Sequence, residues 1–265
     1  STDNTSELVE GWQSQMPFPI RYFWQPNDHK KTAFNRGVKE AAGEFFLTLD
    51  SDDEALPDAL KILNSHWCNI PESERHGFSA VTGLCIDEKG GVIGERFPED
   101  VIDSNSLEIF HRFRITGEKF GFQKTEVLRQ FPFPEDVHGH VPEGIIWSRI
   151  SVKYKTRFVN VPVRCFHFDA GESITRTLSS HTVYADGHAL WAREVLCNEW
   201  RWFSYNPKWF LKMAANYTRF HMHLQKSQPG KRWLLKEFVP RLLMVLMWPV
   251  GLMLYWVDKI KASNG

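Results

Sequence analysis

Apolar and polar residues follow one another along the first part of the chain in segments typical of short helices and strands. Residues 2–12 have an apolar stripe at helical spacing, and residues 20–24 alternate weakly as a strand does. A short helix over 35–42 then leads into the apolar run 45–49, which predicts a buried central strand. This order of helix, strand, helix and strand predicts an α/β sheet with helices on its faces.

The same two periodicities continue to the end of the chain. The elements expected in the middle are a helix over 57–70, a hairpin of 78–86 and 92–93, a helix over 104–113, a helix beginning at Pro142, and a strand over 158–166. From residue 181 the pattern is helical, over 181–200 and 207–225. We therefore expect an α/β domain over residues 1–178 and a C-terminal helical region over 179–265.

Three carboxylates, Asp50, Asp52 and Asp53, follow the apolar run directly. The carboxyl ends of strands in open α/β sheets are where ligands bind. Acids this close repel one another unless a cation lies between them, and a divalent ion with oxygen ligands is the usual solution. The pattern therefore predicts a metal ion that binds a diphosphate, with one alternative left open: Asp53 and its neighbour could simply begin the next helix, whose dipole favours acids.

Several spaced elements resemble the nucleotide-sugar half of bacterial family 2 glycosyltransferases. In chain order they are the opening STDNT, the pattern Ala33-x-Asn35-x-Gly37, the run Ala42-Gly43-Glu44, and Asp50-x-Asp52. The resemblance implies the GT-A fold, which is a mixed sheet flanked by helices, with a C-terminal helical extension here. It also implies transfer of a sugar from a UDP- or GDP-linked donor with inversion at the anomeric carbon, and Mg²⁺ or Mn²⁺ as the cofactor.

The resemblance also suggests which residues bind the donor. We expect donor contacts from Lys31, Asn35, Asp50, Asp52 and Asp53, with Asp52 and Asp50 as metal ligands. The loop of residues 27–31 departs from the family pattern, because many members carry glycines there. The chain begins at Ser1 without an initiator Met, and the resemblance implies that the first strand and a uracil-contacting Asp precede it.

Glu143 is the candidate catalytic base. Pro142 suits the first position of a helix, so Glu143 falls in the first turn, where free N–H groups and the helix dipole favour an ionised carboxylate. In the resembling enzymes the base is a Glu or Asp that opens a helix after a loop containing Phe-Pro, and residues 131–134 read FPFP. The alternative is that Glu143 only complements the helix dipole.

Three further residues are weaker candidates. Lys119 could bind a phosphate or the acceptor, or be an ordinary surface charge, and His140 lies in a loop that we assign to the acceptor side. His167 follows the predicted strand 158–166, and some metal-dependent GT-A enzymes use a late His as an extra metal ligand. The spacing of His138 and His140 is not that of a zinc site.

Charge and cysteine content narrow the function further. The 265 residues carry no net charge, but residues 201–265 hold eleven Lys or Arg and two acids, a net charge of +9. Such a tail indicates a partner of its own, either an anionic membrane surface or nucleic acid. The four cysteines are widely spaced and form no CxxC pair, so neither a zinc site nor a disulfide framework is indicated.

The end of the tail favours the membrane over nucleic acid. After a basic approach, residues 242–257 are sixteen apolar residues, fewer than the roughly twenty that cross a bilayer, and Pro249 and Gly251 interrupt them. We expect residues 231–260 to lie at the membrane interface, with Trp248, Tyr255 and Trp256 at headgroup level. The alternative is a buried C-terminal helix pair or a dimer surface.

Together these features indicate a metal-dependent glycosyltransferase that acts at the cytoplasmic face of a membrane, on a saccharide or lipid-linked acceptor, in cell-surface polysaccharide or glycolipid synthesis. Two alternatives stay open at this point. One is a nucleotidyltransferase, which also uses acids and a metal ion on an α/β sheet. The other is a non-catalytic scaffold associated with the membrane.

Overall fold

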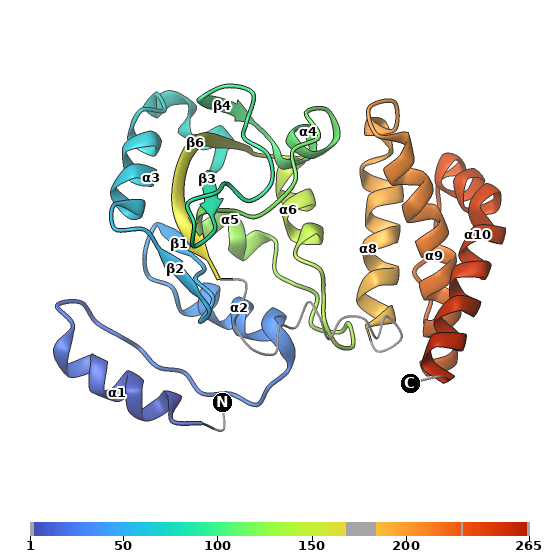
Figure 1. Ribbon diagram of the computed structural model, residues 1–265, viewed down its shortest axis with the longest axis horizontal. Helices are drawn as coiled ribbons and strands as arrows, with labels where there is room; N and C mark the ends of the chain where they lie inside the picture. Colours follow the sequence, from blue (N-terminus) through green and yellow to red (C-terminus); the bar gives the residue numbers. More distant parts are fainter. Residues whose placement is uncertain (1–2, 168–183, 229, 264–265) are drawn as a thin grey trace.

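The computed structural model describes residues 3–167, 184–228 and 230–263 (Figure 1). Its α-helices are α1 Thr5–Gln15, α2 His29–Glu40, α3 Ala59–Cys68, α4 Ser106–His111, α5 Thr125–Gln130, α6 Gly144–Ser151, α8 Ala185–Asn198, α9 Pro207–Ser227 and α10 Phe238–Ser263, with 3₁₀ turns η1 Glu72–Gly77 and η2 Trp200–Trp202. Its strands are β1 Phe45–Leu47, β2 Asp53–Ala55, β3 Phe78–Ile86, β4 Val101–Ser104, β5 Lys119–Lys124 and β6 Lys155–Phe166. The predicted domain boundary at residues 178–179 lies outside the described residues.

The strands form one mixed sheet. Its order is β1-β5-β3-β6-β2, and β4 lies outside this order and pairs with β6. β3 and β6 run parallel, whereas the other pairings are antiparallel. The register Asp53↔Phe166 places β2 against the last residues of β6, so the acids of the 50–53 turn lie at the carboxyl ends of the two parallel strands. The predicted α/β fold with a mixed sheet is confirmed.

Three local predictions were wrong. The run at 45–49 is not a central strand, because within the part of the chain that the structure describes β1 is an edge strand that pairs with β5 alone and is half-buried. Residues 20–24 form no strand. The second helix begins at His29, six residues before the predicted start. The central position was predicted wrongly because an apolar run indicates only that a strand is partly buried. Its place in the sheet depends on strands formed by residues far along the chain.

Helices cover both faces of the sheet (Figure 1). On one face, Leu63 and Trp67 of α3 pack against the inner strands. On the other face, α2, α5 and α6 share a second core that includes Phe34, Leu128 and Ile146. This second core also includes the buried side chain of Leu190 of α8, and so joins the sheet domain to the C-terminal helices.

The C-terminal helices α8, α9 and α10 lie side by side beyond α6, with α10 outermost (Figure 1). A buried polar group joins them to the domain: the carboxylate of Glu199 accepts the Oγ hydrogen of Ser148 at 2.6 Å and lies 3.0 Å from Nε2 of His111. The C-terminal helices therefore pack directly against the sheet domain.

The last helix is longer than the apolar run 242–257 suggested, and it is not interrupted as expected. α10 is one continuous helix of 26 residues with Pro249 inside it, and by length and composition it is apolar enough to cross a membrane. Gly251 does not interrupt it either. A Cβ at this position would collide with the carbonyl oxygen of Ala215 and with Thr218 of α9. Glycine thus permits close packing of α10 on α9, while only 17% of the apolar window is buried.

Candidate active site

Lys30, in the first turn of α2, joins the two predicted halves of the site. Its Nζ lies 2.8 Å from Oδ2 of Asp50 and 2.7 Å from Oε1 of Glu143. The three side chains are between 36% and 43% exposed, so solvent and ligands can reach them. Burial lowers the pKa of Lys30, but Glu143 and Asp50 outweigh this effect and raise the pKa above its ordinary value. The ammonium is therefore charged and shared by two carboxylates.

Asp53 has a different environment from Asp50. Its side chain is 4% exposed and lies 3.0 Å from Nη1 of Arg164, whose other terminal nitrogen lies 3.2 Å from the carboxylate of Glu118. Burial raises the pKa of Asp53, and Arg164 opposes that effect. Arg164 itself is 8% exposed. Asp53 thus fastens the turn to β6 and is poorly placed to bind a ligand.

Asp52 lies between these two paired acids and is exposed. Among the described residues it makes no hydrogen bond or ion pair. Asp50 and Asp52 are therefore the carboxylates of the turn that face solvent. Within the same residues, no group of three or more His, Cys, Asp or Glu side chains is arranged to hold a metal ion. Mg²⁺ does not need such a group, because it often binds one or two carboxylates together with substrate phosphates and water.

Glu143 is the residue that immediately precedes α6, in helical conformation. Its carbonyl accepts hydrogen bonds from the backbone N–H groups of Ile146 and Trp147. His140 lies three residues before it, and burial lowers the pKa of this imidazole while the charge of Glu143 opposes the shift. A neutral imidazole therefore stands close to the candidate base at neutral pH.

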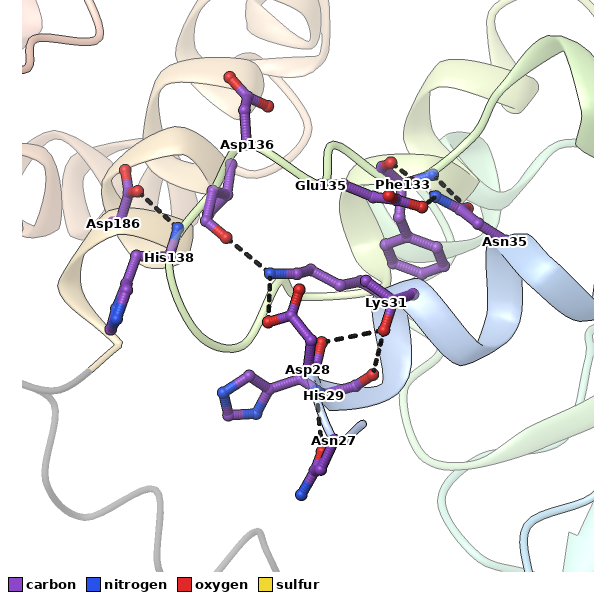
Figure 2. A network of polar contacts seen from close by, with 12 residues as sticks. Asn27, Asp28, His29, Lys31, Asn35, Phe133, Glu135, Asp136, His138 and Asp186 are labelled. Atoms are coloured by element: carbon purple, nitrogen blue, oxygen red, sulfur yellow. Dashed lines mark hydrogen bonds and ion pairs between the residues drawn. The ribbon is translucent and has the colours of Figure 1, made fainter. Parts of the chain in front are cut away.

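Lys31 and Asn35 hold the loop of residues 131–143 rather than the acids of the 50–53 turn (Figure 2). Lys31 is 3% exposed, and its Nζ donates to the carbonyl of Val137 at 2.8 Å and to Asp28 at 3.2 Å. The amide of Asn35 donates to the carbonyl of Phe133 and accepts its N–H, both at 2.9 Å. In this structure both predicted donor-binding residues support the loop that carries Glu143.

Of the two remaining candidates, Lys119 lies at the start of β5 and His167 comes directly after the end of β6. Nζ of Lys119 is held by backbone carbonyls, that of Thr116 at 2.9 Å, and burial lowers its pKa. His167 follows β6 and lies 2.6 Å from Glu88 and 3.7 Å from Glu54. The hydrogen bond to Glu88 raises its pKa. The register of β2 and β6, extended by one residue, places His167 opposite Asp52.

Two residues of this site were missed in the sequence, Lys30 and Arg164. Lys30 was passed over for its neighbour Lys31, although α2 begins at His29 and successive residues of a helix point about 100° apart. Arg164 lies within an otherwise apolar strand segment, between Val163 and Cys165. A charged residue in such a position seldom lacks a partner, and this signal could have indicated an acid elsewhere in the chain.

The chain is similar in sequence to known glycosyltransferases. Residues 1–90 match the family model described as glycosyl transferase family 2. Over 245 residues the chain is 26% identical to a protein of Campylobacter jejuni named GalNAc(5)-diNAcBac-PP-undecaprenol beta-1,3-glucosyltransferase. This alignment covers 89% of the present chain and 74% of the C. jejuni protein.

Solved structures show the same fold at lower identity. The crystal structure of S. aureus TarS 1-349 aligns with a TM-score of 0.53 and 16% identity, over 86% of this chain. The chain spans 61% of the length of that structure. The same protein in complex with UDP aligns with a TM-score of 0.51 and 14% identity, over all of this chain and 80% of the other.

Proposed function

We propose that this chain, a member of glycosyl transferase family 2, moves a sugar from a nucleoside diphosphate donor to a hydroxyl group of its acceptor, with inversion at the anomeric carbon. It is a glycosyltransferase, and its fold is that of TarS, which has been solved with UDP. The single observation that carries the mechanism is the link through Lys30, because it joins the candidate base to the acidic turn within hydrogen-bond distance on each side.

In this mechanism Glu143 takes the proton of the attacking hydroxyl while the new bond forms to the anomeric carbon and the nucleoside diphosphate leaves. Asp50 and Asp52 are the residues that would hold Mg²⁺ or Mn²⁺, and such an ion would stabilise the negative charge of the leaving diphosphate. Lys30 contributes a fixed positive charge between the turn and the base. Asp53 stays paired with Arg164 and keeps the turn in place.

The test is consumption of a UDP- or GDP-linked sugar by the purified chain, with calorimetric binding of UDP and GDP in the presence of Mn²⁺. Donor consumption that requires a divalent ion and an added acceptor is the expected result. Absence of nucleotide binding would contradict the proposal and favour a scaffold role. Release of diphosphate from a sugar phosphate and a nucleoside triphosphate would instead identify a nucleotidyltransferase.

We also propose that the acceptor is a lipid-linked saccharide and that the chain meets it at the cytoplasmic face of a membrane through α10. The name of the C. jejuni relative describes an acceptor linked to undecaprenol. On α10 the exposed apolar residues recur at helical spacing, as Leu242 (46%), Val245 (61%), Leu246 (62%), Met253 (58%), Trp256 (57%) and Ile260 (60%). The basic residues Lys231, Arg232, Lys236 and Arg241 precede this face or lie at its start, where they suit anionic lipid.

Vesicle binding tests this second part of the proposal. The double variant Leu246→Glu/Met253→Glu should lose sedimentation with anionic vesicles, whereas Leu60→Glu, at an equally exposed leucine of α3, should keep it. Equal sedimentation of the two variants would contradict the assignment of α10 to the membrane.

A further inference from the structure

A cleft of about 690 Å³ lies beside the reaction centre. It is formed by the first turn of α2, residues 135–139 of the loop before Glu143, the beginning of α8 and the end of α9. Figure 2 shows the polar groups that surround it. This volume falls within the range of about 300–1,000 Å³ typical of small-molecule sites.

The cleft carries excess negative charge. Asp28, Glu135 and Asp136 line it and are exposed. Lys31 is the lysine among the lining residues, but it is almost fully buried and its Nζ is already bound by Asp28 and the carbonyl of Val137. The other polar groups that face the cleft include the imidazoles of His29 and His138. The residues that line the cleft therefore offer many hydrogen-bond acceptors and few positive charges that could bind an anion.

The wall is also held firmly in place. The side-chain amide of Asn35 makes two hydrogen bonds to the backbone of Phe133 and donates a third to Oε1 of Glu135 at 2.8 Å. Asp186 of α8 is 2% exposed and accepts the N–H of His138 at 2.8 Å. Nζ of Lys231 donates to the carbonyl of Asp136 at 3.1 Å. Three separate segments therefore fix the backbone of this loop, and Asn35 also holds the carboxylate of Glu135, before any ligand arrives.

The cleft and the reaction centre share one helical turn. His29 and Lys31 line the cleft, while Lys30 between them reaches Asp50 and Glu143. His29 has a positive φ of 62°, which is uncommon for a residue other than glycine and occurs often at functional sites. The centre of its ring lies 5.7 Å from that of Tyr184, and the centre of the His140 ring lies 6.0 Å from the same Tyr184 ring.

We propose that this cleft binds an uncharged sugar unit of the acceptor, next to the hydroxyl that Glu143 deprotonates. Hydroxyl and acetamido groups are donors that carboxylates and imidazoles can accept. A diphosphate or a uronic acid would instead meet the exposed carboxylates of Glu135 and Asp136, while Lys31 offsets the charge of Asp28, so the cleft disfavours the charged part of the donor. This inference rests on the proposed glycosyl transfer, because it assigns the acceptor to a site of the same enzyme.

The test compares neutral and anionic sugars. Saturation-transfer NMR on the whole chain would use methyl N-acetylhexosaminides and methyl hexuronides as probes. The wild-type protein should bind the neutral glycosides and bind the hexuronides roughly tenfold more weakly, as expected for repulsion at partly exposed sites. In Glu135→Gln/Asp136→Asn the preference should fall to about twofold or less. A Gln side chain at position 135 keeps an acceptor for Asn35.

The matched control is Asp58→Asn/Glu72→Gln, at exposed acids before α3 and in η1. It should retain the wild-type preference. Equal behaviour of the cleft variant and this control, or equal binding of neutral and anionic sugars by the wild type, would overturn the inference.

A second readout separates this inference from the proposed function. The cleft variant should raise the KM for a saccharide acceptor at least fivefold and leave Mn²⁺-dependent UDP affinity within twofold of the wild type. Loss of UDP binding in the variant would place donor chemistry in the cleft and overturn the inference. Absence of UDP binding in the wild type would contradict the proposed function, while the sugar preference would still test the cleft.

Discussion

Two groups of opposite charges include acids of the 50–53 turn, and they differ chiefly in their exposure. Asp53 and Arg164 are 4% and 8% exposed, whereas Lys30, Asp50 and Glu143 are 36–43% exposed. A buried pair is costly to separate, since each partner would remain as an uncompensated charge. A half-exposed pair can be exchanged for water or ligand at small cost. The buried Asp53 and Arg164 therefore stabilise the turn, whereas the half-exposed Lys30, Asp50 and Glu143 are the residues available for the reaction.

The comparison also changes the argument for a metal ion. Three neighbouring acids indicated a bound cation, and the protein itself supplies two, Arg164 for Asp53 and Lys30 for Asp50. Mutual repulsion of the acids is thus no longer evidence for Mg²⁺ or Mn²⁺. What supports a divalent ion is the exposed Asp52 beside Asp50, together with the diphosphate that the proposed donor would add.

The largest effect should follow removal of the base from the half-exposed cluster. Glu143→Gln should lower kcat for sugar transfer by about 10²–10⁴-fold, the usual range for loss of a general base. UDP affinity should change little, because Glu143 is assigned to the acceptor hydroxyl. Steady-state kinetics and calorimetry measure the two quantities, with Glu126→Gln at an exposed acid of α5 as the control. Wild-type transfer by Glu143→Gln would contradict the base assignment.

Breaking the buried pair should affect stability more than chemistry. Arg164→Met leaves Asp53 buried without its partner, so the free energy of unfolding should fall by about 3–5 kcal/mol. Urea denaturation followed by circular dichroism measures this loss. The double variant Arg164→Met/Asp53→Leu should recover most of it, because an apolar pair of similar volume often replaces a buried ion pair without loss. If the single variant is as stable as the wild type, the two pairs do not differ as described.

Lys30 tests the exposed cluster through its shared cation. Lys30→Met should lower kcat about tenfold, because Glu143 loses its link to the acidic turn, and should change the free energy of unfolding by less than about 1 kcal/mol. Lys39→Met, at an exposed lysine of the same helix, should have neither effect. Kinetics and urea denaturation give both numbers.

A double-mutant cycle shows whether Lys30 acts through Glu143. In the Glu143→Gln background, Lys30→Met should lower the residual rate by less than about threefold, since coupled residues are not additive. A full tenfold loss in that background, accompanied by a similar loss of UDP affinity, would mean that Lys30 acts on the diphosphate instead.

The smallest effect concerns a polar group buried far from the turn. In α9, Nε2 of His221 accepts the N–H of Trp233 at 3.1 Å, and Nδ1 lies 3.1 Å from the carbonyl of Tyr217, so the ring is neutral. Burial lowers its pKa, while Asp186 opposes and Arg232 adds to the shift. As the pH decreases below about 6.5, the unfolded chain therefore binds the proton before the folded protein does. The free energy of unfolding then decreases by at most about 1.4 kcal/mol for each pH unit.

Urea denaturation between pH 7 and 5 measures this slope. In His221→Gln the slope should be shallower, while His76→Gln, at an exposed imidazole of η1, should keep the wild-type slope. Identical slopes in all three proteins would show that His221 does not titrate as its burial requires.

Much of this protein can be predicted locally. Several elements follow from periodicity over a few residues, and β3, α9 and the helix after Pro142 were expected close to where they lie. The spaced Asn, Gly and Asp residues of the first fifty positions, and Glu143 before a helix, indicated the family and the candidate base. Such features depend on neighbouring residues, which the sequence displays directly.

Only the tertiary structure decided which of these charges meet. Asp50 finds Lys30 twenty residues away, Asp53 finds Arg164 on a strand more than a hundred residues later, and β1 proves to be an edge strand. Lys30 and Lys31 are equivalent in the sequence, yet one is half-exposed at the reaction centre and the other is buried under a loop. The physical reason is that burial and pairing depend on segments brought together by the packed core, and no local pattern records them.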